Sequence, residues 1–207
     1  MMETNIINKE QPVIYYTTLN NSITSKTKET VNRYFSDEIV IRMDRCTNPR
    51  LKIRQYLSKE LIVEVCRLTG IHHRELKEIY YAENGKMVFR DNKYFISMSY
   101  SQNFIACYLG MVKVGVDMEV MGELPLTNKI SVLQNLTDET VKGKLDFYTL
   151  WTKIESIVKF YDNIDMYKVL QDKMWKSTSL AIGRYINNNL IFSIATEKIE
   201  KIKIIKL

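Results

Sequence analysis

The sequence predicts an α+β fold with mainly antiparallel sheets. Two long segments have the apolar spacing of amphipathic helices, and several short segments rich in β-branched and aromatic residues have the pattern of strands. Short turns join many of these strands, which is typical of hairpins and therefore of antiparallel sheets. Only 7 Gly and 3 Pro occur among the 207 residues, so no Gly/Pro-rich linker divides the chain.

The N-terminal part is predicted to hold a strand, two helices and a hairpin. The second helix has residues recurring at steps of three and four, and Gly70 follows as a stop signal; the recurring residues are Leu51, Arg54, Leu57, Leu61, Val65 and Leu68. Asn84-Gly85 is a favoured turn pair between two short apolar runs. In chain order these elements are strand 11–19, helices 27–35 and 50–69, and hairpin strands 79–82 and 87–89.

The C-terminal part is predicted to hold more strands and the clearest helix of the chain. One apolar stripe runs along that helix, formed by Phe147, Leu150, Trp151, Ile154, Ile157, Val158 and Tyr161. An Asn triplet at 187–189 marks the turn of a last hairpin. The final residues alternate apolar and basic side chains, as edge strands do. In chain order these elements are strands 94–98, 104–109 and 112–120, helix 145–161, hairpin strands 182–186 and 190–195, and strand 199–207.

The overall composition is that of a soluble globular protein, with 45% hydrophobic and 26% charged residues. The N-terminus is polar, and no segment approaches the ~20 apolar residues that a membrane span requires. We therefore expect a cytoplasmic protein. The 3 cysteines are odd in number and widely spaced, which predicts reduced and mostly buried thiols rather than disulfides or a zinc site.

The formal net charge is +6, and the basic residues are spread along the chain. They occur between Arg42 and Lys59 and again near the C-terminus. Two interpretations stay open: a solvated basic surface, or attraction to an anionic ligand or partner such as phosphate groups, an acidic protein or nucleic acid.

Two acidic residues share one face of the predicted strand at 112–120. Side chains two apart on a strand project the same way, so Asp117 and Glu119 lie together and repel each other. Such a pair needs a cation, or one carboxyl group must stay protonated. Mg²⁺ with phosphate oxygens and water fits it, although two acidic residues on a surface strand are a common arrangement without any ligand.

The clearest helix adds a further carboxylate and a lysine. Glu155 and Lys159 are four residues apart and therefore share a helix face. They form either a surface ion pair or, beside the strand pair, a third carboxylate and a phosphate-binding cation.

Taken together, GVDME at 115–119 and WTKIESIVK at 151–159 resemble the paired signature of the phosphopantetheinyl transferase superfamily. That signature is a G-[IV]-D-x-E strand followed by a helix of the form W-x-x-K-E-S/A-x-x-K. Residues 95–99 (FISMS) resemble the N-I-S-H-S segment of the larger, surfactin-synthetase type, residues 84–86 its G-K-P turn, and residues 54–57 its R-x-L-L helix start.

The resemblance implies a monomer made of two similar α+β halves related by a pseudo-twofold axis, here 1–110 and 111–207. Coenzyme A would bind between them. The implied activity transfers the 4'-phosphopantetheine group from coenzyme A to a serine of an acyl or peptidyl carrier protein, with Mg²⁺ as cofactor.

The resemblance also implies residue roles. Asp117, Glu119 and Glu155 would hold Mg²⁺ against the pyrophosphate, and Glu155 would help to deprotonate the attacking serine. Lys159 would stabilise negative charge on the phosphate and the leaving group. The remaining implied coenzyme A contacts are Arg45, Arg54, Lys86, Ser97 and Ser99.

Two positions depart from the signature. Met98 stands where the family has histidine, and Ile154 stands where it has the lysine before the glutamate. Each change removes a charge-assisted contact of about 1.5–3 kcal/mol. Lys153 points elsewhere on the helix. A coenzyme A-binding or carrier-binding homologue without efficient transfer is therefore an alternative, and a basic nucleic-acid-binding domain is a more remote one.

Overall fold

The computed structural model describes residues 11–19, 22–122, 126–198 and 201–207. It confirms an α+β fold with mainly antiparallel strand pairs. The chain forms two compact units. Unit 1 contains the described residues up to Ile96, Cys107–Val112 and the stretch from residue 201, and unit 2 contains Ser97–Ala106 and the described part of 113–199. The predicted halves were single stretches, whereas each unit is built from several.

In unit 1, the boundaries of the longest helix follow from its capping residues. The Asn48 side chain accepts a hydrogen bond from the Leu51 N–H, and Pro49 occupies the first turn. Gly70 ends the helix at φ 71°, a left-handed conformation that glycine adopts without strain. The helices of this unit are α1 (Ser25–Tyr34), α2 (Asp37–Asp44), α3 (Pro49–Thr69) and a 3₁₀ helix (His73–Glu78).

Two sheets include strands of unit 1. The larger has the strand order β4-β5-β1-β9, and the smaller is the antiparallel hairpin β2-β3, with Gly85 at φ 79° in its turn. The C-terminal edge strand is confirmed at β9, which pairs in parallel with β1; residues 199–200 of that prediction lie outside the described part. These strands are β1 (Val13–Thr18), β2 (Ile79–Tyr81), β3 (Met87–Phe89), β4 (Phe95–Ser101), β5 (Phe104–Gly110) and β9 (Lys203–Lys206).

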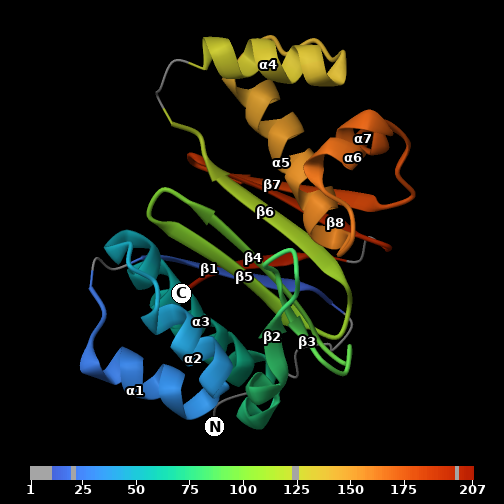
Figure 1. Cartoon of the computed structure of the whole chain (residues 1–207). Helices are drawn as coiled ribbons and strands as arrows, with labels where there is room; N and C mark the ends of the chain where they lie inside the picture. The colour runs from blue at the N-terminus through green and yellow to red at the C-terminus, as the bar shows by residue number, and fades with distance from the viewer. Residues whose placement is uncertain (1–10, 20–21, 123–125, 199–200) are drawn as a thin grey trace, which may run out of the picture. The chain divides into compact units, whose positions relative to one another are not determined.

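Unit 2 is built on an antiparallel sheet of three strands in the order β6-β8-β7. Figure 1 shows α5 lying against β6 and β8. All seven residues of the central strand β8 are buried. The elements are β6 (Val114–Val120), α4 (Thr127–Thr137), α5 (Lys144–Phe160), α6 (Met166–Gln171), α7 (Met174–Ser177), β7 (Ala181–Asn187) and β8 (Leu190–Thr196).

A glycine lets α5 approach β6 closely. A Cβ atom at Gly115 would lie 2.0 Å from the carbonyl oxygen of Ser156 and 2.4 Å from the backbone nitrogen of Phe160. Real Cβ atoms do not tolerate such distances, and backbone atoms cannot turn away as a flexible side chain can. The glycine of GVDME is therefore needed for helix–sheet packing.

The predicted apolar stripe of α5 lies in the core of unit 2. Phe147, Ile154 and Ile157 are buried, and the other predicted stripe residues pack against the same cluster. Ile154 is fully buried, so the isoleucine that replaces the family's lysine acts as a core residue.

The structure adds helices that the sequence pattern did not predict: α2, α4, α6 and α7. Each buries only one or two side chains, so a periodic apolar stripe is missing. Within α3, the stripe prediction was correct at Leu57 and Leu61 but wrong at Leu51, which is exposed. Lys59 was counted among the basic residues of a possible solvated surface, but its side chain is buried.

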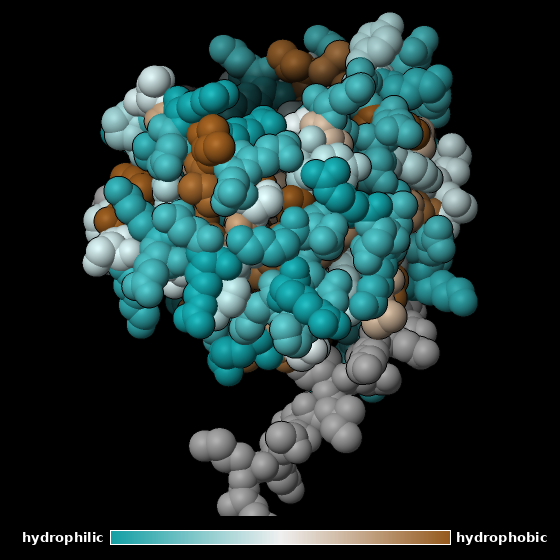
Figure 2. Space-filling model, turned by 60° about the horizontal axis from the view of Figure 1, so that its bottom comes forward, coloured by the Kyte–Doolittle hydropathy of each residue, from teal (hydrophilic) through white to brown (hydrophobic). Residues whose placement is uncertain are grey.

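The face drawn in Figure 2 is largely hydrophilic, with separate apolar side chains among the polar ones. No helix in the described part of the chain is long and apolar enough to cross a membrane. Cys66 and Cys107 are buried free thiols and Cys46 is half-buried, in agreement with the prediction.

Candidate functional site

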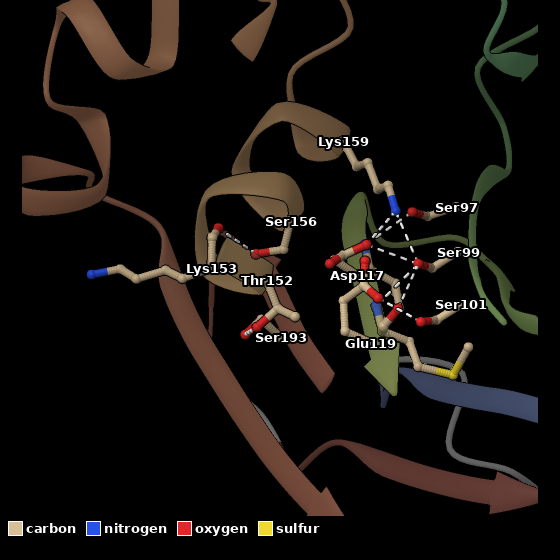
Figure 3. A network of polar contacts seen from close by, with 12 residues as sticks. Ser97, Ser99, Ser101, Asp117, Glu119, Thr152, Lys153, Ser156, Lys159 and Ser193 are labelled. Carbon is tan, nitrogen blue, oxygen red and sulfur yellow. Dashed lines mark hydrogen bonds and ion pairs between the residues drawn. The ribbon is translucent and has the colours of Figure 1, made fainter. Parts of the chain in front are cut away.

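Three of the five segments that resemble the transferase signature contribute side chains to one cluster in unit 2. The Lys159 Nζ on α5 lies 2.6 Å from the Asp117 Oδ1 on β6 and 3.1 Å from the Ser99 Oγ on β4. Figure 3 shows these side chains converging from the three elements. The Asp117 side chain is only 4% exposed, whereas that of Lys159 is 23% exposed. The lysine therefore connects a buried carboxylate to the surface.

Alternate residues of β4 attach this strand to β6 through side chains. β6 ends its own sheet, so alternate N–H groups along it have no strand partner there. Serine hydroxyl groups of β4 accept hydrogen bonds from three of these N–H groups (Figure 3). The pairs are Ser97 with Val116, Ser99 with Met118 and Ser101 with Val120, at 2.9, 3.0 and 2.9 Å.

Two of these serines also orient the acidic pair. Ser99 Oγ donates to Asp117 Oδ1 at 2.8 Å, and Ser101 Oγ donates to Glu119 Oε2 at 2.5 Å. The carboxylates therefore face the serines from the same side of β6, as the strand alternation predicted. Ser97 and Ser99, which the resemblance assigns to coenzyme A, are buried and bonded to β6 in this structure.

The repulsion expected between Asp117 and Glu119 is reduced in two ways, by an ion pair at Asp117 and by a raised pKa at Glu119. Lys159 forms an ion pair with Asp117. Burial raises the pKa of Glu119, and the charge of Asp117 acts in the same direction, while Ser101 and Lys159 oppose the shift. Glu119 therefore takes up a proton more readily than an exposed glutamate, so the pair avoids carrying two uncompensated charges.

The predicted magnesium ligands do not assemble as a set of three. Among the described residues, no group of three or more His, Cys, Asp or Glu side chains is arranged to hold a metal ion. Glu155 lies half-buried on α5, one turn before Lys159, and Lys159 takes the position beside Asp117. Asp117 Oδ2 is buried without a hydrogen-bond partner in the described part of the chain.

The remaining residues that the comparison with the transferase signature singled out lie outside the Asp117 cluster. Lys153 points away from the Asp117 cluster, as predicted (Figure 3), and burial lowers its pKa. Met98 alternates with the serines along β4, so its side chain points to the opposite face of the strand. The three basic residues assigned to coenzyme A belong to unit 1: Arg45 is exposed after α2, Arg54 is half-buried in α3, and Lys86 is half-buried beside the β2–β3 turn.

A mostly apolar pocket of about 470 Å³ lies beside Glu119, which forms part of its lining. Val132 and Leu136 line it from α4, and Tyr148 and Trp151 line it from α5. Its volume is in the range of small-molecule sites. The sequence pattern did not predict this pocket because α4 itself was not predicted.

A second polar pair was also missed. Thr152 Oγ1 on α5 and Ser193 Oγ on β8 lie 2.8 Å apart in the interior. Nothing in the sequence spacing connects them. The alternating serines at 97, 99 and 101, in contrast, can be read from the sequence. Their hydrogen-bond partners could not be predicted, because these depend on which strand lies beside β4.

Ser99→Ala is expected to lower the free energy of unfolding by about 1–3 kcal/mol, because it leaves the buried Met118 N–H without its acceptor. Urea unfolding would measure the change. Ser131→Ala is the matched control, since the Ser131 hydroxyl is exposed on α4 and bonds only within its own helix. Equal stability of the two variants would contradict a role for Ser99 in joining β4 to β6.

A scan against models of known protein families matched none of them, and a search of curated proteins found no match to this chain.

Proposed function

We propose that this protein transfers the 4'-phosphopantetheine group of coenzyme A to a serine of an acyl or peptidyl carrier protein. The observation that carries the proposal is the contact of Lys159 with Asp117 and Ser99. It brings together side chains from three of the five sequence segments that resemble the transferase signature, namely 95–99, 115–119 and 151–159.

In the proposed reaction, the carrier serine oxygen attacks the β-phosphorus of coenzyme A. The bond from that phosphorus to the bridging oxygen breaks, and adenosine 3',5'-bisphosphate leaves. Phosphoryl transfer depends mainly on positioning and on neutralising charge. Lys159, partly exposed and held by Asp117, is suited to stabilise charge on the transferred and leaving phosphates. Glu155, one turn earlier, would accept the serine proton.

The pocket at Glu119 supports this assignment. The pantetheine arm combines a branched apolar segment with amide groups, and the pocket combines Val132, Leu136 and Trp151 with polar groups such as Asn128. Mg²⁺ and the pseudo-twofold arrangement of halves enter the proposal through the family resemblance alone.

The test is a transfer assay with coenzyme A and apo carrier proteins of the fatty-acid, polyketide and peptide-synthetase classes, with Mg²⁺ or after chelation. We expect the carrier to gain the mass of one phosphopantetheine group. Asp117→Asn and Lys159→Met should slow the gain by roughly 100-fold or more, the usual cost of losing a transition-state contact. Mass spectrometry of the carrier gives the readout.

Lys153→Met is the matched control, because Lys153 is on the same helix but points away from the cluster. It should leave the rate near that of the unmodified protein. Unchanged rates in both site variants would reject the site, and no mass gain on any carrier class would reject the transfer.

A homologue that binds coenzyme A without efficient transfer is the second candidate, favoured by Met98 and Ile154. Restoring lysine at 154 is not a useful experiment, because Ile154 is fully buried in the core and a charge there would disrupt packing. Met98→His would not restore a phosphate contact at the cluster either, because residue 98 points to the face of β4 opposite Ser99. Coenzyme A binding with no carrier mass gain in the unmodified protein would distinguish this candidate from the first.

A further inference from the structure

Lys59 on α3 is a buried lysine in unit 1. It is 2% exposed, and its Nζ donates a hydrogen bond to Tyr81 Oη on β2 at 2.7 Å. A buried ammonium group is ordinarily paired with a carboxylate. Within the described residues, no carboxylate forms a hydrogen bond or ion pair with Lys59.

A second cation shares the same tyrosine. The Arg42 guanidinium carbon on α2 lies 4.0 Å from the centroid of the Tyr81 ring, and the Lys59 Nζ lies 5.2 Å from it. No ion pair joins Arg42 to an acidic residue in the described part of the chain. Burial first, and then the charge of Arg42, lower the pKa of Lys59 to about 7. A large share of the protein therefore carries an uncharged amine at neutral pH.

Two carboxylates on α2 and α3 bind other residues. Asp44 of α2 accepts from Tyr56 Oη at 2.8 Å and pairs with Lys52 at 3.5 Å. Glu60 of α3 accepts from Thr27 of α1 at 3.2 Å. The cluster of Arg42, Lys59 and Tyr81 thus has an excess of positive charge and of hydrogen-bond donors, and it lacks an anion.

We propose that Lys59 is a carbamylation site that takes up carbon dioxide. The lone pair of the uncharged Nζ forms an N–C bond to the carbon of CO₂, one C–O π bond opens to give an oxyanion, and a proton leaves Nζ for solvent. The product is a carbamate with one negative charge and one N–H. The carbamate oxygens accept from Arg42 and Tyr81. The anion that the cluster lacks is thereby formed on the lysine itself.

The test is carbon NMR of the full chain at pH 8 in buffer containing ¹³C-bicarbonate, which supplies ¹³CO₂. We expect a carbamate resonance that is absent in Lys59→Gln and lost on unfolding in urea, whereas the carbamate of an α-amino group, with its ordinary pKa of about 8, remains in both cases. Lys153→Gln is the control, because Lys153 is also partly buried with a lowered pKa, and it should retain the resonance. Absence of the signal in the unmodified protein, or its persistence in Lys59→Gln, would overturn the proposal.

A second variant keeps the proposal testable if Lys59→Gln folds poorly. Arg42 is exposed, so Arg42→Gln should fold, and it should weaken the apparent CO₂ affinity about tenfold by removing a charge-assisted contact. Unchanged affinity would contradict the assigned role of Arg42. Bicarbonate should also raise the melting temperature more than sulfate does at equal ionic strength. If sulfate stabilises as strongly and only when Lys59 is present, the cluster is a simple anion site and the carbamate is wrong.

Discussion

Gly115→Ala is expected to destabilise the protein by about 3 kcal/mol or more, the upper range for overpacking a close-packed site. The added methyl group would lie 2.0 Å from the Ser156 carbonyl oxygen and 2.4 Å from the Phe160 nitrogen, both backbone atoms of α5. The helix would have to move away from β6, which would also separate Lys159 from Asp117. Urea unfolding measures the first effect, and the transfer assay measures the second.

Gly143→Ala is the matched control. Gly143 precedes the same helix, has nothing within 4 Å of the position of an added Cβ, and has an extended backbone that any residue adopts. Its stability should change by less than about 0.5 kcal/mol. If Gly115→Ala is as stable as this control, α5 and β6 do not approach each other as closely as the structure has them.

Lys59→Met is expected to raise stability at neutral pH and to change how stability depends on pH. The folded-state pKa of Lys59 is about 7, below its ordinary value of 10.5. Between these pH values the unfolded chain binds one more proton than the folded chain, so the stability of the unmodified protein rises with pH across this window. The penalty for burying Lys59 is fully present below pH 7 and is lost toward pH 10.5.

Lys59→Met should therefore exceed the unmodified protein in free energy of unfolding by a smaller margin as the pH rises. This margin should fall by about 3 kcal/mol between pH 6.5 and 9.5, at about 1.4 kcal/mol per pKa unit. Urea unfolding at each pH, in buffer freed of bicarbonate, gives the difference between variant and unmodified protein. Lys28→Met, on the exposed side of α1, should show no such trend. A constant difference at Lys59 would mean that its amine stays charged in the folded state.

The candidate site was predictable in its acidic part. Alternation along the strand placed Asp117 and Glu119 on one face, and the α5 periodicity placed Ile154 in the core. The spacing of the acidic pair also indicated that it needs a cation or a protonated carboxyl group. Lys159, expected to bind phosphate, proved to be that cation; the set of three carboxylates that the resemblance implied was not assembled in the described residues.

By itself, the sequence determined the main strands and both principal helices, because apolar periodicity, capping residues and turn pairs are local signals. It also placed a glycine, Gly115, two residues before Asp117 in the acidic strand. Only the tertiary structure decided that Lys59 is buried beside Tyr81, that the serines of β4 bond to β6, and that Lys159 meets Asp117. Burial and charge pairing depend on which distant segments pack together. That packing is set by the free energy of the whole folded chain and not by local sequence signals.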